Sequence, residues 1–152
     1  MTRFSQIRDV LEQVSGFHGQ LAAYYSQLAG TAAQERVKLL LDYLSSHERN
    51  LEKSLVDYED DASRQVLETW VDETHCTKML AGCRTMQLPS AMSVEDVARI
   101  AMQIDECLVR IYRHLADKAE TESVRDVFRN LVTLEQGELR KLALNALRAG
   151  DV

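Results

Sequence analysis

The chain has 152 residues, 45% of them hydrophobic and 28% charged, a balance that is typical of a globular domain and excludes a disordered chain. A formal net charge of −6 disfavours nucleic acid and anionic membrane surfaces as partners, and no apolar run is long enough to cross a bilayer. One proline and six glycines leave room for long uninterrupted helices.

The start of the chain and its cysteines predict a cytoplasmic location. The segment Met1 to Phe4 leads directly into a polar amphipathic pattern and has no apolar core of the kind found in signal peptides. The three cysteines, Cys76, Cys83 and Cys107, are an odd number without the spacing of a disulfide framework. This usage suits a reducing compartment.

Apolar residues at helical spacing predict a first helical hairpin over residues 3–58. Its helices cover residues 3–29 and 32–58, and the connection between them is short enough to force an antiparallel pair. The inward stripes are Ile7, Leu11, Val14, His18, Leu21, Tyr25 and Leu28 on the first helix, and Val37, Leu41, Leu44, Glu48, Leu51, Leu55 and Tyr58 on the second.

A second hairpin is predicted over residues 93–148, after a connection that spans residues 59–92. The connection is too long for a simple turn, and it is expected to hold a short helix through Val66 and Trp70 and to run the length of the helices. We therefore expect an all-α fold, a four-helix bundle with one long crossover, in a single domain over residues 1–152.

A shift of 87 positions aligns one hairpin with the other without a gap. The shift places Tyr25 on Tyr112 and Glu48 on Glu135, as well as many leucines on leucines. Two amphipathic hairpins of equal length will share leucines by chance, but matched tyrosines and glutamates at core positions favour an internal duplication.

Four polar residues fall at the middle of the predicted inward stripes: His18, Glu48, Glu135 and Glu138. The shift of 87 positions places Asp105, also near the middle of its helix, on His18 and adds it as a fifth. Side chains at one height on the inner face of each helix converge on one small volume. Burying unpaired carboxylates is costly, so such a cluster requires a cation, a proton or hydrogen-bond partners. The sequence thus predicts a candidate metal site, with the neighbouring His47 as a second choice if its helix turns by one residue.

Each hairpin carries an acid or a histidine seven residues before a tyrosine, followed by a glutamate on the partner helix. This pattern resembles the ferritin-like superfamily, most closely its rubrerythrin-like members, over nearly the whole chain. In that family each hairpin provides a glutamate from its first helix and a Glu-x-x-His motif from its second, and the six ligands hold two iron or manganese ions. The resemblance assigns ligand positions to His18 and Asp105, to Glu48 with Leu51, and to Glu135 with Glu138.

This chain departs from the family pattern at several of these positions. His18 and Asp105 replace the two first-helix glutamates, and the motif histidine is Leu51 in one half and Glu138 in the other. The polar cluster is also compatible with a metal-free core in which Glu135 and Glu138 share a proton, and with a slightly rotated helix that exposes both carboxylates.

Two functions follow as expectations. The first is a ferritin-like metal-binding protein, an oxidoreductase that holds iron or manganese at an atypical site and reacts with oxygen or peroxide. The second is a metal-free helical module that has lost the metal centre and acts through its surface. In either case the expected partner is a second copy of the chain or another protein, since an aromatic residue such as Trp70 on an outer helix is a common interface anchor.

Overall fold

The computed structural model describes residues 4–72, 78, 80–82 and 93–150. Within the last helix, the side chains of residues 138, 139, 142, 143 and 145–150 lie outside this description. The part that is described is predominantly helical, which confirms the all-α class.

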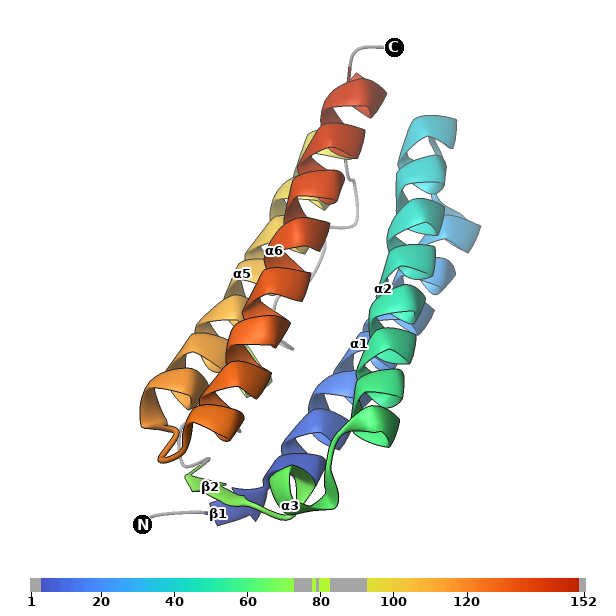
Figure 1. Cartoon of the computed structure of the whole chain (residues 1–152). Helices are drawn as coiled ribbons and strands as arrows, with labels where there is room; N and C mark the ends of the chain where they lie inside the picture. The colour runs from blue at the N-terminus through green and yellow to red at the C-terminus, as the bar shows by residue number, and fades with distance from the viewer. Residues whose placement is uncertain (1–3, 73–77, 79, 83–92, 151–152) are drawn as a thin grey trace.

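Four long helices make up most of the molecule (Figure 1). They are α1 (Ile7–Thr31), α2 (Glu35–Asp61), α5 (Val94–Lys118) and α6 (Glu122–Gly150). Helix α1 packs against α2 and α5 packs against α6, so the chain forms two helical hairpins, and α2 also contacts both α5 and α6. The hairpins agree with the predicted ranges 3–58 and 93–148 to within a few residues at their ends.

The direction of the helices in Figure 1 fits the predicted crossover. Helix α1 runs upward in this view and α2 returns downward, while α5 starts at the top, runs downward and is followed by α6 running upward. The connection between α2 and α5 therefore starts at one end of the molecule and finishes at the other. Most of residues 73–92 lie outside the described part of the chain.

A small two-stranded sheet closes the lower end of the molecule in Figure 1, where only helix was expected. Strand β1 (Phe4–Gln6) pairs antiparallel with β2 (Trp70–Asp72), and the short helix α3 (Arg64–Leu67) precedes β2. The expectations of a helix from residue 3 and of a crossover helix reaching Trp70 and beyond were therefore wrong. Helical spacing is ambiguous over so few residues, and here the backbone groups pair across two segments far apart in the sequence.

The predicted inward stripes form the core. Every stripe residue is buried except Leu28 and Tyr58, which are partly buried and pack against the core. At the corresponding positions of the second hairpin, Ile104, Leu108 and Phe128 are also buried, whereas several positions in the second half of α6 have side chains outside the description. Heptad spacing therefore identified the inward faces of all four long helices.

The helix starts reproduce the internal repeat. Helices α1 and α5 begin 87 positions apart, and so do α2 and α6. The caps repeat as well: the backbone N–H of Gln6 donates to Asp9 at 3.3 Å, and that of Ser93 donates to Asp96 at 3.2 Å. Such cap contacts do not depend on apolar matches, so they support the duplication independently of the leucines.

Among the described residues, none of the helices is both long enough and apolar enough to span a membrane. Cys107, on the buried face of α5, is disulfide-bonded. This bond corrects the expectation of reduced cysteines, which rested on their number and spacing alone. Because disulfides are rare in reducing compartments, it also weakens the argument for a cytoplasmic location.

Candidate metal centre

Four of the five predicted site residues are buried at the middle of the four long helices. His18 on α1, Glu48 on α2, Asp105 on α5 and Glu135 on α6 are each 2% exposed or less. The side chain of the fifth, Glu138, lies outside the described residues. One residue predicted for the site from the stripes or from the repeat is thus buried near the middle of each long helix.

His18 bridges two of the carboxylates. Its Nδ1 lies 2.5 Å from Oε2 of Glu48, and its Nε2 lies 2.8 Å from Oε1 of Glu135. The histidine therefore joins α1 to α2 within its own hairpin and to α6 in the other hairpin. The two glutamates that it joins are the pair matched by the internal repeat.

The pKa of His18 is raised well above the usual value for an imidazole. Burial alone would lower this pKa, but the negative charge of Glu135 and the hydrogen bonds from Glu135 and Glu48 outweigh the effect of burial. A protonated imidazole has an N–H on both nitrogens, so it can donate to both carboxylates at once.

Acidic groups outnumber the bridging imidazole in the cluster. Three buried carboxyl groups, those of Glu48, Asp105 and Glu135, accompany His18, whose pKa is raised. No lysine or arginine is buried in the described part of the chain. Burying this charge without compensation would be costly, so the site favours an additional cation or additional protons.

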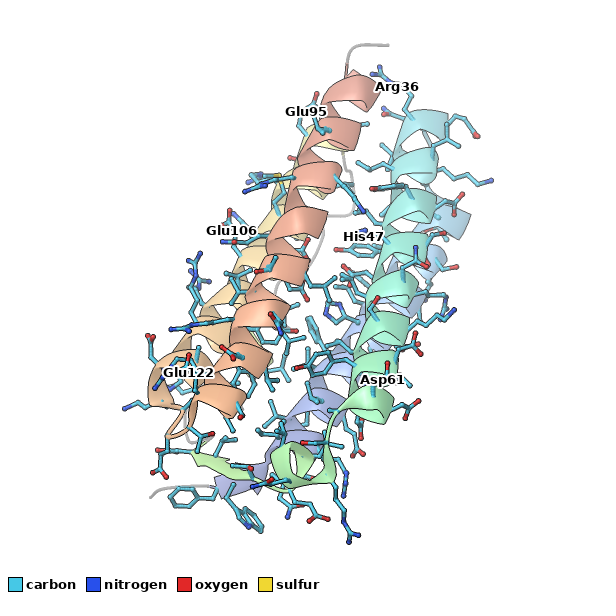
Figure 2. All side chains as sticks on the ribbon, viewed as in Figure 1. Arg36, His47, Asp61, Glu95, Glu106 and Glu122 are labelled. Atoms are coloured by element: carbon cyan, nitrogen blue, oxygen red, sulfur yellow. The ribbon has the colours of Figure 1, made fainter. Side chains whose placement is uncertain are left out.

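A second histidine provides donors for such a cation. His47, Glu48 and Asp105 each offer one ligand atom, and these atoms lie within 4.8 Å of one another. His47 is 5% exposed, its ring stacks on that of Tyr43 with centroids 6.0 Å apart, and it lies on the side of α2 turned toward the other hairpin (Figure 2). Imidazole and carboxylate together are ligands that iron, manganese and zinc accept.

The sequence placed His47 second to Glu48, on the assumption that only one of two neighbours faces inward. Both are buried. Adjacent helical positions differ by about 100° in direction, so two neighbours can share a broad buried face. His47 therefore groups with Glu48 and Asp105 without any rotation of α2, and the spacing of inward residues did not predict this feature of the site.

Two buried tyrosines border the cluster. The Tyr112 hydroxyl donates to Oε1 of Glu135 at 3.4 Å. The Tyr25 hydroxyl is buried and has no hydrogen-bond partner among the described residues. Burial raises the pKa of both phenols, and nearby carboxylates raise it further: Glu48 and Asp105 for Tyr25, Glu135 above all for Tyr112.

This difference between the tyrosines predicts different effects of removing each hydroxyl. Tyr112→Phe should lower the free energy of unfolding by about 1 kcal/mol, because Glu135 loses a donor in a buried setting. Tyr25→Phe should be neutral or slightly stabilising, because it removes an unpartnered hydroxyl. Urea unfolding of both variants with a chelator present measures the two values, and equal losses would contradict this assignment.

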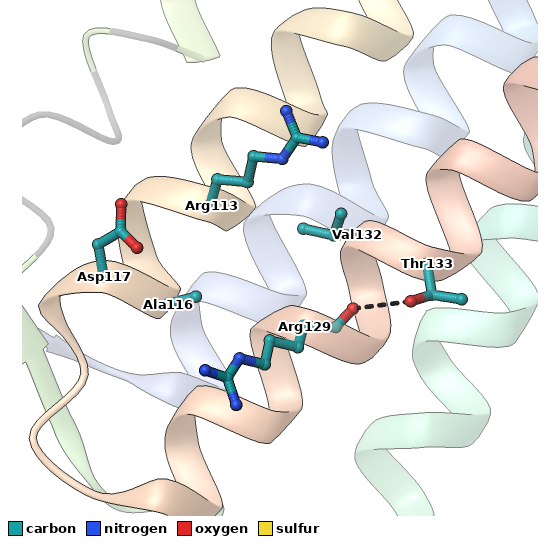
Figure 3. A pocket seen from close by; sticks show the side chains of 6 residues that line it. All are labelled: Arg113, Ala116, Asp117, Arg129, Val132 and Thr133. Atoms are coloured by element: carbon teal, nitrogen blue, oxygen red, sulfur yellow. Dashed lines mark hydrogen bonds between the residues drawn. The ribbon is translucent and has the colours of Figure 1, made fainter.

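A separate hollow lies between α5 and α6, away from the buried cluster (Figure 3). It is lined by Arg113, Ala116, Asp117, Arg129, Val132 and Thr133. The Arg129 guanidinium already pairs with Glu122 at 3.1 Å and with Asp126 at 3.8 Å. None of the predicted ligand residues lines this hollow, so we do not assign the metal site to it.

Comparison of the chain with protein families, curated proteins and solved structures finds no match. The class of the protein therefore follows from its fold and its site alone. It is a predominantly helical protein with a buried histidine, glutamate and aspartate group that could hold a metal ion.

Proposed function

We propose that the protein is a ferritin-like metal-binding protein that holds iron or manganese inside its helices. The observation that carries the proposal is the buried group of His47, Glu48 and Asp105, whose ligand atoms lie within 4.8 Å of one another. Three donors at this separation can approach one ion from different sides, and a partly open coordination sphere leaves room for a small molecule.

The chemistry of the surrounding residues fits a cation. Oε2 of Glu135 is buried and has no hydrogen-bond partner in the described part of the chain. The excess of carboxylates over protonated imidazole is the kind of imbalance that a divalent ion offsets. Carboxylate oxygens combined with one imidazole suit iron or manganese better than the soft ions that select thiolates.

The assignment to the ferritin-like class is supported by topology and by the repeat. Two antiparallel hairpins with a crossover place α2 and α5 in the same direction, and one polar residue per helix meets at mid-height. Ferritin-like proteins build their metal centres from carboxylates and histidines in the same way. Tyr112 donates to Glu135, the carboxylate that His18 joins to Glu48, and so helps to hold the polar cluster in place.

An oxidoreductase activity toward oxygen or peroxide is the finer part of the proposal. A bound iron or manganese ion would supply the electrons for that chemistry. The chain supplies the enclosure: His18 holds Glu48 and Glu135 in place, and the apolar residues around the cluster exclude bulk water. Metal binding is tested first because the activity depends on it.

The decisive experiment measures metal content and metal-dependent stability. The protein is purified without chelator or affinity tag, and its metal content is measured by elemental analysis. Its thermal unfolding is then followed with and without added ferrous, manganous or zinc ions. Binding should raise the melting temperature, since a ligand at a hundredfold excess over its Kd contributes about 2.7 kcal/mol. Asp105→Asn, which keeps the shape of the side chain and removes its charge, should abolish the rise.

Glu106→Gln is the matched control, because Glu106 is an exposed carboxylate next to Asp105 on the same helix (Figure 2). It should leave metal content and the melting shift unchanged. The absence of bound metal and of any shift in the unmodified protein would remove the metal-binding proposal. An equal loss in both variants would indicate a nonspecific effect of surface charge.

A metal-free interaction module is the second candidate, and two observations favour it. His18 already neutralises part of the buried charge without a metal. Phe4 and Trp70, 59% and 64% exposed, lie on one face of the small sheet, because Phe4 pairs with Asp72 and Trp70 pairs with Gln6. Exposed aromatic residues of this kind anchor contacts with a second copy or another protein.

A further inference from the structure

The internal repeat allows the two halves of the polar cluster to be compared residue by residue. The shift of 87 positions relates Glu48 to Glu135, His18 to Asp105 and His47 to Leu134. The group formed by His47, Glu48 and Asp105 therefore has a counterpart formed by Leu134, Glu135 and His18. A symmetric protein would hold one ion in each of these two groups.

The first group has three donors. The ligand atoms of His47, Glu48 and Asp105 lie within 4.8 Å of one another, and all three residues are buried. They come from two helices of different hairpins, α2 and α5, so the donors face each other across the interface between the hairpins.

Among the residues whose side chains are described, the second group differs from the first in two ways that disfavour an ion. Leu134 has no donor atom at the position that corresponds to His47. His18 and Glu135 contact each other through Nε2 and Oε1 at 2.8 Å, so these atoms face one another and leave no space for an ion between them. The remaining nitrogen of His18, Nδ1, is engaged by Glu48 at 2.5 Å.

We propose that the centre holds one metal ion, in the half formed by His47, Glu48 and Asp105, and that His18 fills the position of a second ion. His18 is then a positioning residue: it fixes Glu48, which faces the ion, and ties it to Glu135 of the other hairpin. This inference rests on the proposed metal binding. It goes further by stating how many ions are bound and which residues bind them.

The experiment is a titration of the full-length protein with manganous ion, followed by equilibrium dialysis and elemental analysis. The unmodified protein should saturate at one ion per chain and give the electron paramagnetic resonance spectrum of an isolated ion. Saturation at two ions, or the spectrum of a coupled pair, would overturn the inference and leave the proposed metal binding intact. No binding at all would overturn both.

A gain-of-site variant tests the place of the ion. His18→Asp with Leu134→His copies the donor set of the first half into the second and should raise the saturation value to two. Leu134→His alone is the control. Its saturation value should remain at one ion per chain, because His18 still contacts Glu135. Saturation at two ions per chain in the single variant would show that His18 does not prevent an ion from binding beside Glu135.

The location of the first ion is checked by removing one donor from each half. His47→Leu should lose the ion, whereas Glu135→Gln should keep it. The reverse result would place the ion in the second half and overturn the inference. Far-ultraviolet circular dichroism of each variant confirms that its helices are retained before binding is measured.

Discussion

Replacing His18 by leucine is expected to lower the free energy of unfolding by about 3–5 kcal/mol. The histidine is fully buried and contacts Glu48 and Glu135 with its two ring nitrogens. Leucine is of similar size, so the substitution removes the positive charge and both donors with little loss of volume. Two buried carboxylates then lack their compensating partner. Urea unfolding at neutral pH, with a chelator present, measures the loss.

A triple variant separates the loss of charge balance from a general intolerance of substitution. His18→Leu combined with Glu48→Leu and Glu135→Leu removes the histidine together with both carboxylates that it compensates. Replacing a complete buried ion network by apolar residues is often neutral or stabilising, so the triple variant should recover most of the stability lost in the single one. A loss below about 1 kcal/mol in His18→Leu would show that the histidine does not carry the compensating charge.

Phe128→Ala is expected to cost about 3–5 kcal/mol, for a reason that is independent of charge. Phe128 is fully buried on α6, two turns before Glu135 on the same face of the helix. The truncation leaves a cavity in the core of the molecule, and the loss of packing adds to the loss of hydrophobic burial. Thermal and urea unfolding, compared with the unmodified protein, give the value.

Leu39→Ala provides the control for this truncation. Leu39 is 59% exposed on α2, so its replacement should change the free energy of unfolding by no more than about 0.5 kcal/mol. Phe128→Leu, which keeps most of the apolar volume, should fall between the two. Equal losses in Leu39→Ala and Phe128→Ala would mean that the burial of Phe128 contributes far less to the free energy of unfolding than its position in the core indicates.

Most of the helical framework could be predicted from the sequence, because its signal is repeated many times. Each long helix carries five to seven apolar residues at constant spacing, so one ambiguous position does not change the inward face. Ser93 and Thr121 are residue types that commonly begin helices, and each side-chain oxygen accepts from a backbone N–H three residues later. Three buried polar residues, His18, Glu48 and Glu135, followed from the same spacing, and Asp105 followed from the internal repeat.

The small sheet could not be predicted in the same way. Strands β1 and β2 have three residues each, and they pair across more than sixty intervening positions. No local pattern over three residues distinguishes a strand from the first turn of a helix. The pairing is determined by where α2 and α3 bring the chain, which is a property of the tertiary structure.

The contacts between polar side chains within the site could not be predicted from the sequence either. Stripe positions place His18, Glu48 and Glu135 at one height, but they do not say that the histidine contacts both glutamates. Stripe spacing also predicted that only one of His47 and Glu48 faces inward, whereas both are buried. Which donors meet depends on how far each helix is rotated about its axis, and a change smaller than one residue position decides it.

The bridge made by His18 has a consequence for the order of events in folding. Its contact with Glu48 spans 30 positions within one hairpin, whereas its contact with Glu135 spans 117 positions and joins the two hairpins. Contacts of low sequence separation close quickly, and distant ones wait until the chain between them is organised. The donors His47 and Asp105 are likewise on different hairpins. Under the proposed function, capture of a metal ion would therefore report on the docking of two preformed halves, and stopped-flow mixing with a metal indicator would time that step.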